Sequence, residues 1–572
     1  MNTIFFIFSL LILLHFDAKL YIISLLTVVF LLFIESYILA TIVAVICLIF
    51  CIPMVRRYII SAPLLGFIKT LGVLPKISET EKTAIDAGTT WAEGEFFKTK
   101  PDISKILTEP FEQDLSEEEK RYLANEVEEI CASTNDWEIF ENKDLPPSVW
   151  QKLKEKRIFG MIIPKEYGGL EFSALAQSAV VGKLASVSQV LAITTMVPNS
   201  LGPGELLLKY GTDKQKNYYL PRLANGTDIP CFGLTEPFAG SDAASIKSHG
   251  VLFKDGDRLK IRINFEKRYI TLGGVATIIG LAFKLEDPEN LIPSDKKIGI
   301  TCALLRGDLE GITRGRRHMP MHVPFINSPI WGKDVVIDVE EDVIGGKDGL
   351  GEGWRMLMEC LSVGRGISLP AVTGFASKFC TFATLMYSSI RKQFGMPVAK
   401  FEAIEEVLAR MIANTYTSEA IRIFTASAVK NGHKPAITNA IAKYHTTEIS
   451  RKVVNDAMDI LGGAAISTGP NNLVAHAYMG IPVGITVEGA NIITRALLQF
   501  GQGLMRCHPF LYNEMVAIQN GDLKSFDKNF WSHFGSFFVK RVRMFTLLVK
   551  GFVVEPFCRS IESKYSLKIE RI

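Results

Sequence analysis

The hydrophobic and polar positions divide the chain into an almost continuously apolar front and a longer body of ordinary polarity. The front, residues 1–54, carries only three charged side chains, namely Asp17, Lys19 and Glu35. A bilayer core of about 30 Å takes roughly 20 apolar residues in a helix, so the front predicts two or three membrane-embedded helices, with Glu35 near a turn or an interface. A cleaved signal peptide would have a basic start and a shorter apolar run. The Arg56–Arg57 pair that follows predicts that the body faces the cytoplasm.

Behind the front, helical periodicity comes first, strand-like runs follow, and helical periodicity then returns. A capping-box pattern, Ser116-x-x-Glu119, opens the first helix. Further helices are predicted over residues 149–157, 174–192, 204–210, 215–224, 402–430 and 437–461. Strands are predicted over residues 252–254, 259–264, 276–283, 299–306 and 334–338. Strands grouped in one block predict an α+β fold and argue against the alternating βαβ units of a Rossmann-type fold.

This order predicts how the chain is divided into domains. The predicted segments are membrane-embedded helices (1–57), a connecting segment (58–110), an N-terminal helical domain (111–229), a middle β domain (230–345), a C-terminal helical domain (346–515) and a C-terminal helical extension (516–572). Within the extension, residues 530–554 are aromatic and basic. We expect them either to cover the main domain or to touch the membrane.

Composition and motif content exclude several kinds of partner and site. The chain has 63 basic and 60 acidic residues, a balance too even for a nucleic-acid binder. Its nine cysteines form no C-x-x-C pair, which predicts reduced and mostly buried thiols. No G-x-G-x-x-G follows a strand and no Walker A motif is present, and the glycine-rich stretch 345–353 predicts a flexible connection before a helix. His318 and His322 are separated by Met-Pro-Met, which favours a packed or surface role over a helical metal pair.

The most informative stretch is residues 232–242, FGLTEPFAGSD, in which small residues and hydroxyls follow an apolar, strand-like start. Such a loop lets backbone N–H groups approach a ligand closely, but the residues alone are equally consistent with a plain turn. The pattern T-E-P-x-A-G-S-D resembles the flavin-binding loop of acyl-CoA dehydrogenases. Further stretches resemble that family's motifs in the same order, namely KRYIT (267–271), RKQFG (391–395), DAMDILGG (456–463) and VEGANIITR (487–495).

The resemblance, which is strongest to the large bacterial FadE-type enzymes, implies the acyl-CoA dehydrogenase fold. That fold has an N-terminal helical domain, a middle β domain and a C-terminal helical bundle, here preceded by the membrane helices. Glu488 matches the family's catalytic base, and Arg365 matches an active-site arginine. Ser241 and Gly489 match positions that contact the substrate.

The same resemblance implies FAD as the cofactor and assigns residues to it. The matching positions are Thr235 near the pyrimidine side of the isoalloxazine, Ser241 near the phosphates, Tyr269 and Thr271 at the N5 edge, Gly462 and Gly463 at the adenine end, and Arg391 and Phe394 reaching FAD from a neighbouring subunit. The same cofactor-binding motifs also contain Phe232, Leu234, Gly240 and Asp459.

Three positions depart from the family pattern. Ala490 stands where Thr is usual, Asp459 where Gln is common, and Glu402 where Gln often follows R-K-Q-F-G. The first change removes one hydroxyl contact to the cofactor, and all three changes fit the FadE-like pattern. The larger FadE-type proteins continue with an extra helical region, whereas this sequence stops at Ile572.

The implied chemistry explains why these residue types are needed. The α C–H of a thioester is a weak acid, so its removal needs a carboxylate in a dry site and a polarised carbonyl. Exclusion of water raises the pKa of such a carboxylate, here Glu488, and makes it a stronger base. In the family, the backbone N–H of this residue and a flavin ribityl hydroxyl stabilise the charge on the thioester oxygen.

The sequence therefore predicts FAD-dependent α,β-dehydrogenation of fatty acyl-CoA to trans-2-enoyl-CoA, the first step of β-oxidation, with electrons passed to an electron-transfer flavoprotein. An oxygen-using acyl-CoA oxidase and a non-catalytic flavoprotein of the same fold are the alternatives, and the retained Glu488 argues against the second. The expected setting is a homo-oligomer, a dimer or tetramer without a nucleic-acid partner, at the inner (cytoplasmic) membrane. The acyl-chain length depends on helix packing around residues 190–205 and 365–385.

Overall fold

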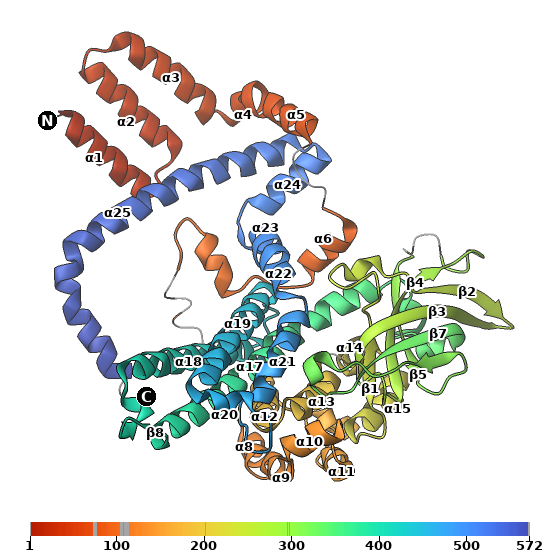
Figure 1. Cartoon of the computed structure of the whole chain (residues 1–572). Coiled ribbons are helices and arrows are strands. Elements are labelled where there is room, and N and C mark those ends of the chain that lie inside the picture. Colours follow the sequence, from red (N-terminus) through yellow and green to blue (C-terminus); the bar gives the residue numbers. More distant parts are fainter. Residues whose placement is uncertain are drawn as a thin grey trace. The chain divides into compact units, whose positions relative to one another are not determined.

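The structure is a computed structural model that describes residues 2–72, 77–102, 104, 107, 114–200, 202–293, 296 and 298–569. Parts of the expected connecting segment 58–110 lie outside the described residues. The chain forms two compact units, and most of their elements are labelled in Figure 1. The main unit consists of Ser78–Trp91 and Glu109–Gln502, and the terminal unit of Met1–Ile77, Ala92–Thr108 and Gly503–Ile572.

The main unit begins with short helices whose ends follow local sequence signals. They are α6 (Glu79–Asp86), α8 (Glu117–Ala124), α9 (Glu126–Ala132), α10 (Asp136–Asn142), α11 (Pro147–Glu155), α12 (Ala174–Val187), α13 (Gln189–Ser200), α14 (Gly204–Tyr210) and α15 (Asp213–Ala224). The predicted capping box is confirmed, because Ser116 Oγ accepts from the backbone N–H of Glu119 and the Glu119 carboxylate accepts from that of Ser116. The prediction of one helix over 174–192 is wrong. Ser188 is extended and separates α12 from α13, and serine favours such a boundary over a helix interior.

A seven-stranded sheet follows and confirms the predicted α+β arrangement of helices, strands and helices. Its strands are β1 (Pro230–Gly233), β2 (His249–Asp255), β3 (Arg258–Thr271), β4 (Ile278–Glu286), β5 (Ile300–Arg306), β6 (Ile312–Arg314) and β7 (Asn327–Asp338). The strand order is β1-β4-β2-β3-β7-β6, with β5 paired to β4. The register of β3 on β7 shifts between Lys267 and Ile270, and such irregularities re-aim side chains at functional sites.

The main unit ends in a bundle of long helices. Its elements are α16 (Val339–Asp342), α17 (Gly353–Ile390), β8 (Lys392–Gln393), β9 (Met396–Pro397), α18 (Glu402–Lys430), α19 (Ala436–Leu461), α20 (Gly463–Ile466), α21 (Ala475–Thr486), α22 (Asn491–Ile493) and a π-helix (Thr494–Gln502). Helices α17, α18, α19 and α21 lie together in Figure 1, and α17 also packs on α12 and α13. The predicted helices 402–430 and 437–461 are confirmed by α18 and α19, the second of which starts one residue earlier.

The terminal unit combines apolar helices with the C-terminal helix. It contains α1 (Asn2–His15), α2 (Leu20–Phe33), α3 (Tyr37–Cys51), α4 (Pro53–Arg56), a π-helix (Arg57–Ser61), α5 (Ala62–Leu71), α23 (Gly503–Cys507), α24 (Leu511–Asn520) and α25 (Leu523–Ile569). Glu35 lies in the turn between α2 and α3, as the sequence predicts. Arg56 makes a bidentate ion pair with the buried Asp527, which ties the apolar helices to α25. Among the described helices, none alone is both long and apolar enough to cross a membrane, whereas two bent helix pairs meet the criteria of length and composition.

Two glycines inside α17 provide a test of how closely the bundle packs. A Cβ added at Gly364 would lie 2.7 Å from the backbone oxygen of Ser200 at the end of α13, whereas the nearest atom to one at Gly374 is Ser418 Oγ, at 3.6 Å. Helix propensity alone favours alanine over glycine by about 1 kcal/mol at both positions. We nevertheless expect Gly364→Ala to lower the free energy of unfolding by about 1–3 kcal/mol, because α13 has to move.

The matched control is Gly374→Ala, which should be neutral or slightly stabilising because its added methyl group meets only ordinary van der Waals contact. Denaturant unfolding of both variants, followed by circular dichroism, measures the difference. Equal effects of the two substitutions would contradict the close approach of α13 to α17.

Candidate active site

The loop at residues 232–242 is held by a buried ion pair. The Glu236 carboxylate accepts hydrogen bonds from Lys267 Nζ (2.7 Å) and from the backbone N–H of Ser248 (3.1 Å), and Lys267 also donates to the backbone oxygen of Leu234 (3.2 Å). Burial lowers the pKa of Lys267 to about 8, although Glu236 opposes this shift. At Glu236, burial raises the pKa, but the hydrogen bonds from Lys267 and Ser248 outweigh it and the net pKa is lowered. Lys267 on strand β3 therefore holds the loop in place through these buried contacts.

The loop residues assigned to FAD divide into packed and accessible ones. Phe232 and Leu234 pack against a hydrophobic core cluster. Thr235 is half-buried, and its backbone oxygen accepts from the N–H of Arg268 at 2.9 Å. Gly240 and Ser241 are exposed. The accessible part of the loop is thus its second half, and Thr235 stands where the loop meets β3.

The end of β3 presents the aromatic ring and hydroxyl that the sequence singled out. Tyr269 has a φ of +59° and remains 53% exposed. Asn327 on β7 donates to the backbone oxygen of Tyr269 (3.0 Å) and to Thr271 Oγ1 (3.3 Å). His318 binds the Asn327 side chain at 2.8 Å, and its ring lies 4.9 Å from that of Tyr269. His318 therefore has a packed role, one of the two predicted for it, and supports the irregular strand end.

Glu488 stands in a tight turn between α21 and α22. Its φ is +56° and that of Gly489 is +90°, a left-handed conformation that residues other than glycine seldom adopt. The residue is partly exposed, but both carboxylate oxygens are buried and have no hydrogen-bond partner in the described part of the chain. Burial raises the pKa of Glu488, and the positive charges of Arg365 and Lys443 oppose the shift. A buried carboxylate without a partner is costly, so this arrangement indicates a functional group rather than a structural one.

Two cations approach this turn from neighbouring helices. On α17, Arg365 Nη2 lies 3.7 Å from the position that a Cβ at Gly489 would take, so the structure brings Arg365 to the predicted base. On α19, Lys443 is fully buried and donates to the backbone oxygen of Gly489 at 2.7 Å. Sequence reasoning missed Lys443. The signal was its helical spacing from the buried Ala440 and Thr447, which places a lysine on the inward face of α19.

An apolar cavity of about 70 Å³ lies beside the turn. Its lining includes Val487, which precedes Glu488, and Thr271 at the end of β3. Apart from these, most of the wall comes from α13, α17 and α21, and the lining positions of α13 and α17 fall within or next to the ranges 190–205 and 365–385. The cavity thus connects the predicted base and the predicted flavin edge with the interior of the helical bundle.

Gln189 lines the cavity beside Gly480, at the opposite end of the α21 lining from Val487. Along α21 the lining runs from Gly480 to Val487, which at 1.5 Å per residue is about 10 Å. Gln189 lies beside Gly480, since a Cβ added there would fall 1.5 Å from Gln189 Oε1. Its amide also donates to the backbone oxygen of Ala477 at 3.4 Å. The side chain is therefore held in place at this end.

Arg391 and Phe394 do not join this cluster within one chain. Arg391 is the C-terminal cap of α17, about 40 Å along that helix from Arg365. Phe394 lies in the turn between β8 and β9 and is 92% exposed. Both side chains are available to another molecule rather than to the Glu488 cluster of their own chain.

Asp459, Gly462 and Gly463 lie where α19 ends, also away from the Glu488 turn. A Cβ added at Gly240 or Gly463 would meet no described atom within 4 Å, and neither glycine has a positive φ. The fold itself therefore does not require glycine at these two positions. Open space beside backbone N–H groups suits a phosphate-bearing ligand, so these residues fit the FAD that the sequence implies.

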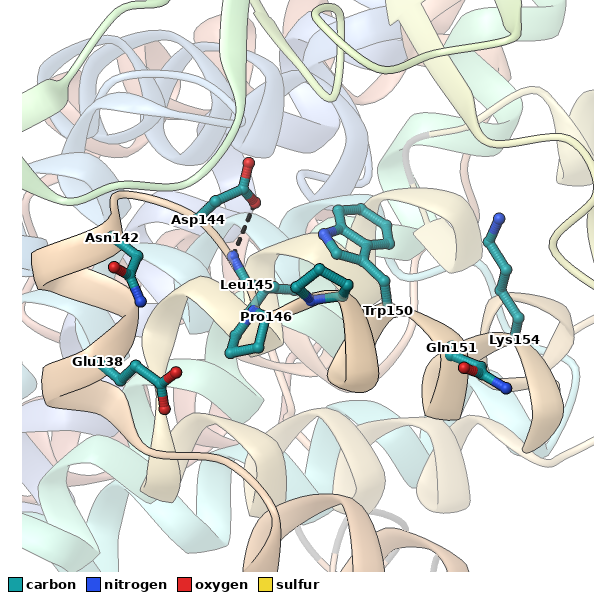
Figure 2. A pocket seen from close by; sticks show the side chains of 9 residues that line it. Glu138, Asn142, Asp144, Leu145, Pro146, Trp150, Gln151 and Lys154 are labelled. Carbon is teal, nitrogen blue, oxygen red and sulfur yellow. Dashed lines mark hydrogen bonds between the residues drawn. The ribbon is translucent and has the colours of Figure 1, made fainter.

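A second depression, of about 700 Å³, lies between α10 and α11 (Figure 2). Trp150, Pro146 and Lys154 are among its walls, and at its rim the backbone N–H of Leu145 donates to Asp144 at 2.7 Å. None of the residues assigned from the sequence lines it. It is therefore separate from the Glu488 cluster.

Known protein families match the chain in the same order as its domains. The models that match are the acyl-CoA dehydrogenase N-terminal domain over residues 110–227, the middle domain over 231–329, the C-terminal domain over 351–501 and the bacterial-type C-terminal domain over 505–572. The butyryl-CoA dehydrogenase structure from Megasphaera elsdenii superposes with a TM-score of 0.61 at 24% identity, covering 68% of this chain and 99% of that one, which shows the shared fold.

Individual proteins of the same family are also similar to the chain in sequence. The human mitochondrial very long-chain specific acyl-CoA dehydrogenase is 29% identical over 403 residues, which are 69% of this chain and 60% of that protein. The chain thus spans less than two thirds of that relative's length. The 3-(aryl)acrylate reductase of Clostridium sporogenes is 30% identical over 373 residues, which are 64% of this chain and 89% of that protein. The chain belongs to the acyl-CoA dehydrogenase family, whose members are flavin-dependent oxidoreductases that act on CH–CH bonds.

Proposed function

We propose that the protein is an FAD-dependent dehydrogenase that converts a fatty acyl-CoA to its trans-2-enoyl-CoA, with Glu488 as the base. One observation carries the proposal: the Glu488 carboxylate is buried and lacks a partner among the described residues, in a turn whose preceding residue, Val487, lines an apolar cavity. A surface carboxylate would be hydrated, and a structural one would be paired. Only a group that meets its partner in the substrate complex fits this arrangement.

The chain's own residues would remove the α-proton. Burial raises the pKa of Glu488, so its ionised carboxylate is a stronger base than one in water. The charges of Arg365 and Lys443 oppose the shift and favour the ionised form that catalysis needs. The α-proton passes to the Glu488 carboxylate while the β-hydrogen leaves with its electron pair as a hydride. When bound, FAD supplies the acceptor for that hydride.

Residues of two chains would hold the cofactor. On the β domain, Ser241 and Tyr269 are exposed and Thr235 is half-buried, and Thr271 adjoins the cavity. The exposure of Phe394 supports its role in reaching the FAD of a neighbouring copy. A homo-oligomer, a dimer or tetramer, follows from this proposal.

The apolar lining supports a fatty acyl chain as the substrate. The lining runs for about 10 Å along α21, the length of roughly eight methylene groups at about 1.3 Å per carbon, given C–C bonds of about 1.5 Å. The volume of about 70 Å³ is too small for such a chain unless the walls move apart on binding. We assign the reaction to the first step of β-oxidation, with an electron-transfer flavoprotein as the acceptor. An acyl-CoA oxidase is the second candidate. Steady production of hydrogen peroxide during turnover distinguishes it from a dehydrogenase.

We further propose that the terminal unit attaches the protein to the inner (cytoplasmic) membrane, with the catalytic body in the cytoplasm. Helices α1, α2 and α3 expose many large apolar side chains, with Ile38 at 81% and Phe5 at 73%. In α25, Phe537 and Phe538 are also exposed, beside basic residues that would face lipid headgroups. So large an exposed apolar surface is typical of a membrane-binding unit.

Replacement of the base provides the central test. Glu488→Gln keeps the side-chain volume but removes the charge, so we expect flavin reduction by a saturated acyl-CoA to slow by about 10²–10⁴-fold or more while acyl-CoA binding is largely kept. Anaerobic stopped-flow absorbance of the flavin measures the rate. Denaturation of both proteins should release FAD rather than FMN. In contrast, Glu236→Gln should mainly weaken FAD retention, because it leaves the fully buried Lys267 without its anionic partner. A near wild-type rate in Glu488→Gln would show that the base lies elsewhere.

The end of the cavity at Gln189 provides a test of chain length. Gln189→Ala removes the amide at this end, so the preferred substrate should become longer by about two to four carbons at about 1.3 Å each. The matched control is Gln189→Leu, which keeps a side chain of similar size and should keep the preference. Rates of flavin reduction across a series of saturated acyl-CoAs measure it. An unchanged optimum in Gln189→Ala would place the end of the acyl chain elsewhere.

Membrane attachment is tested on the exposed face of α3. Ile38→Glu combined with Ile42→Glu places charges at two exposed positions one helical turn apart, and should strongly reduce flotation of the full-length protein with phospholipid vesicles. Tyr218→Glu, which adds a charge at an exposed aromatic position on α15, is the control and should leave flotation unchanged. Equal flotation of both variants and the wild type would contradict attachment through α3.

A further inference from the structure

Lys443 makes an unusually complete set of contacts for a buried lysine. Its side chain is fully buried on α19. The ammonium group donates to the backbone oxygens of Gly489 (2.7 Å) and Ile485 (3.2 Å) and to Asn491 Oδ1 (2.8 Å). An ammonium group has three donors, so each one is used. All three acceptors lie within three residues of Glu488.

These acceptors span the turn that carries Glu488. Ile485 lies near the end of α21, Gly489 is the second left-handed residue, and Asn491 opens α22. A left-handed conformation is unfavourable for a residue other than glycine and persists only where its surroundings enforce it. Lys443 joins both ends of the turn and its centre, so it enforces this conformation at Glu488. Thr494 Oγ1 adds one further hydrogen bond to the Gly489 oxygen, at 3.0 Å.

The charges around the turn come from two helices. Arg365 faces it from α17, and Lys443 and Glu448 face it from α19. The Asn491 side chain donates to Glu448 at 2.8 Å while it accepts from Lys443. Asn491 thus links the Glu448 carboxylate to Lys443 by hydrogen bonds. The Glu488 oxygens have no such partner among the described residues. The buried ammonium group therefore acts on Glu488 through space.

We propose that Lys443 is a positioning residue for the reaction: it holds the Glu488–Gly489 turn in its left-handed conformation and, by its charge, keeps the Glu488 carboxylate available as a base. The inference rests on the proposed role of Glu488 and assigns a second task to a residue that touches neither substrate nor cofactor. A neutral donor could satisfy part of the hydrogen bonding. Only a cation also favours ionisation of a carboxylate in a dry site.

The pH dependence of flavin reduction separates this role from a purely structural one. Removal of a nearby positive charge should raise the pKa of Glu488 further above its usual value, because burial then acts with less opposition. In Lys443→Met, we expect the midpoint of the rising pH–rate profile to move up by about one unit or more, so that the rate below the midpoint falls about tenfold. The difference from the wild type should shrink as the pH rises. Anaerobic flavin reduction by one saturated acyl-CoA, followed across a pH series in the full-length FAD-bound protein, measures it.

Two further variants complete the experiment. Lys452→Met changes an exposed lysine on the same helix and should leave the profile unchanged. Lys443→Gln keeps hydrogen-bond donors but lacks the charge, so it should fold at least as well as Lys443→Met and show the same shift.

The possible outcomes are distinct. A rate that falls by the same factor at every pH, or an unchanged profile, overturns the proposal, and so does loss of folding in both Lys443 variants, which would make Lys443 a folding residue. A wild-type protein whose flavin is not reduced by any acyl-CoA overturns the proposed function itself. An active wild type with an unshifted Lys443→Met profile overturns only the assignment of Lys443.

Discussion

The left-handed turn at Glu488 and Gly489 is the constraint on which the rest of the active region depends. A carboxylate can stay buried without a partner only if the backbone that carries it is held rigidly, since otherwise it would rotate toward water or a cation. Here the rigidity comes from the ends of α21 and α22 and from hydrogen bonds to the oxygen of Gly489. The long helices of the bundle thus position the one side chain that we propose as the base.

Two buried lysines anchor the two segments that carry the site. Lys267 ties the 232–242 loop to β3 through Glu236 and Leu234, and Lys443 ties the Glu488 turn to α19. Burial lowers the pKa of each lysine to about 8. They differ in their anionic partner. Lys267 has Glu236 in direct contact, so that pair is internally satisfied, whereas the charge of Lys443 has no carboxylate in contact among the described residues and acts on Glu488 at longer range.

Close helix packing shapes the cavity next to this turn. Glycines on α17 and α21 allow the backbone of one helix to approach side chains or backbone of another, as at Gly364 against Ser200 and Gly480 against Gln189. The space that remains between α13, α17 and α21 is narrow and mostly apolar. Such a space suits the flexible hydrocarbon chain of the proposed substrate, and Gln189 is the polar residue of its lining on α13.

The sequence by itself determined the local elements and the family. The capping box at Ser116, the block of strands and the long helices ending near Gly432 and Gly462 follow from short-range rules, because each depends on residues within one or two helical turns. Ordered motifs were enough to single out Glu488 and Arg365, which the structure brings together. The boundary at Ser188 was missed, since a single serine within an apolar helical pattern is a weak signal.

Only the tertiary structure decided which distant groups complete the site. Lys443 lies 46 residues before Gly489, and nothing in its local pattern distinguishes a structural lysine from one that faces a reactive carboxylate. Gln189 and Gly480 meet in the wall of the cavity although their helices are almost 300 residues apart. The physical reason is the same in both cases: hydrogen bonding and desolvation depend on what packs against a side chain, and for residues far apart in the chain that is decided by the packing of whole helices.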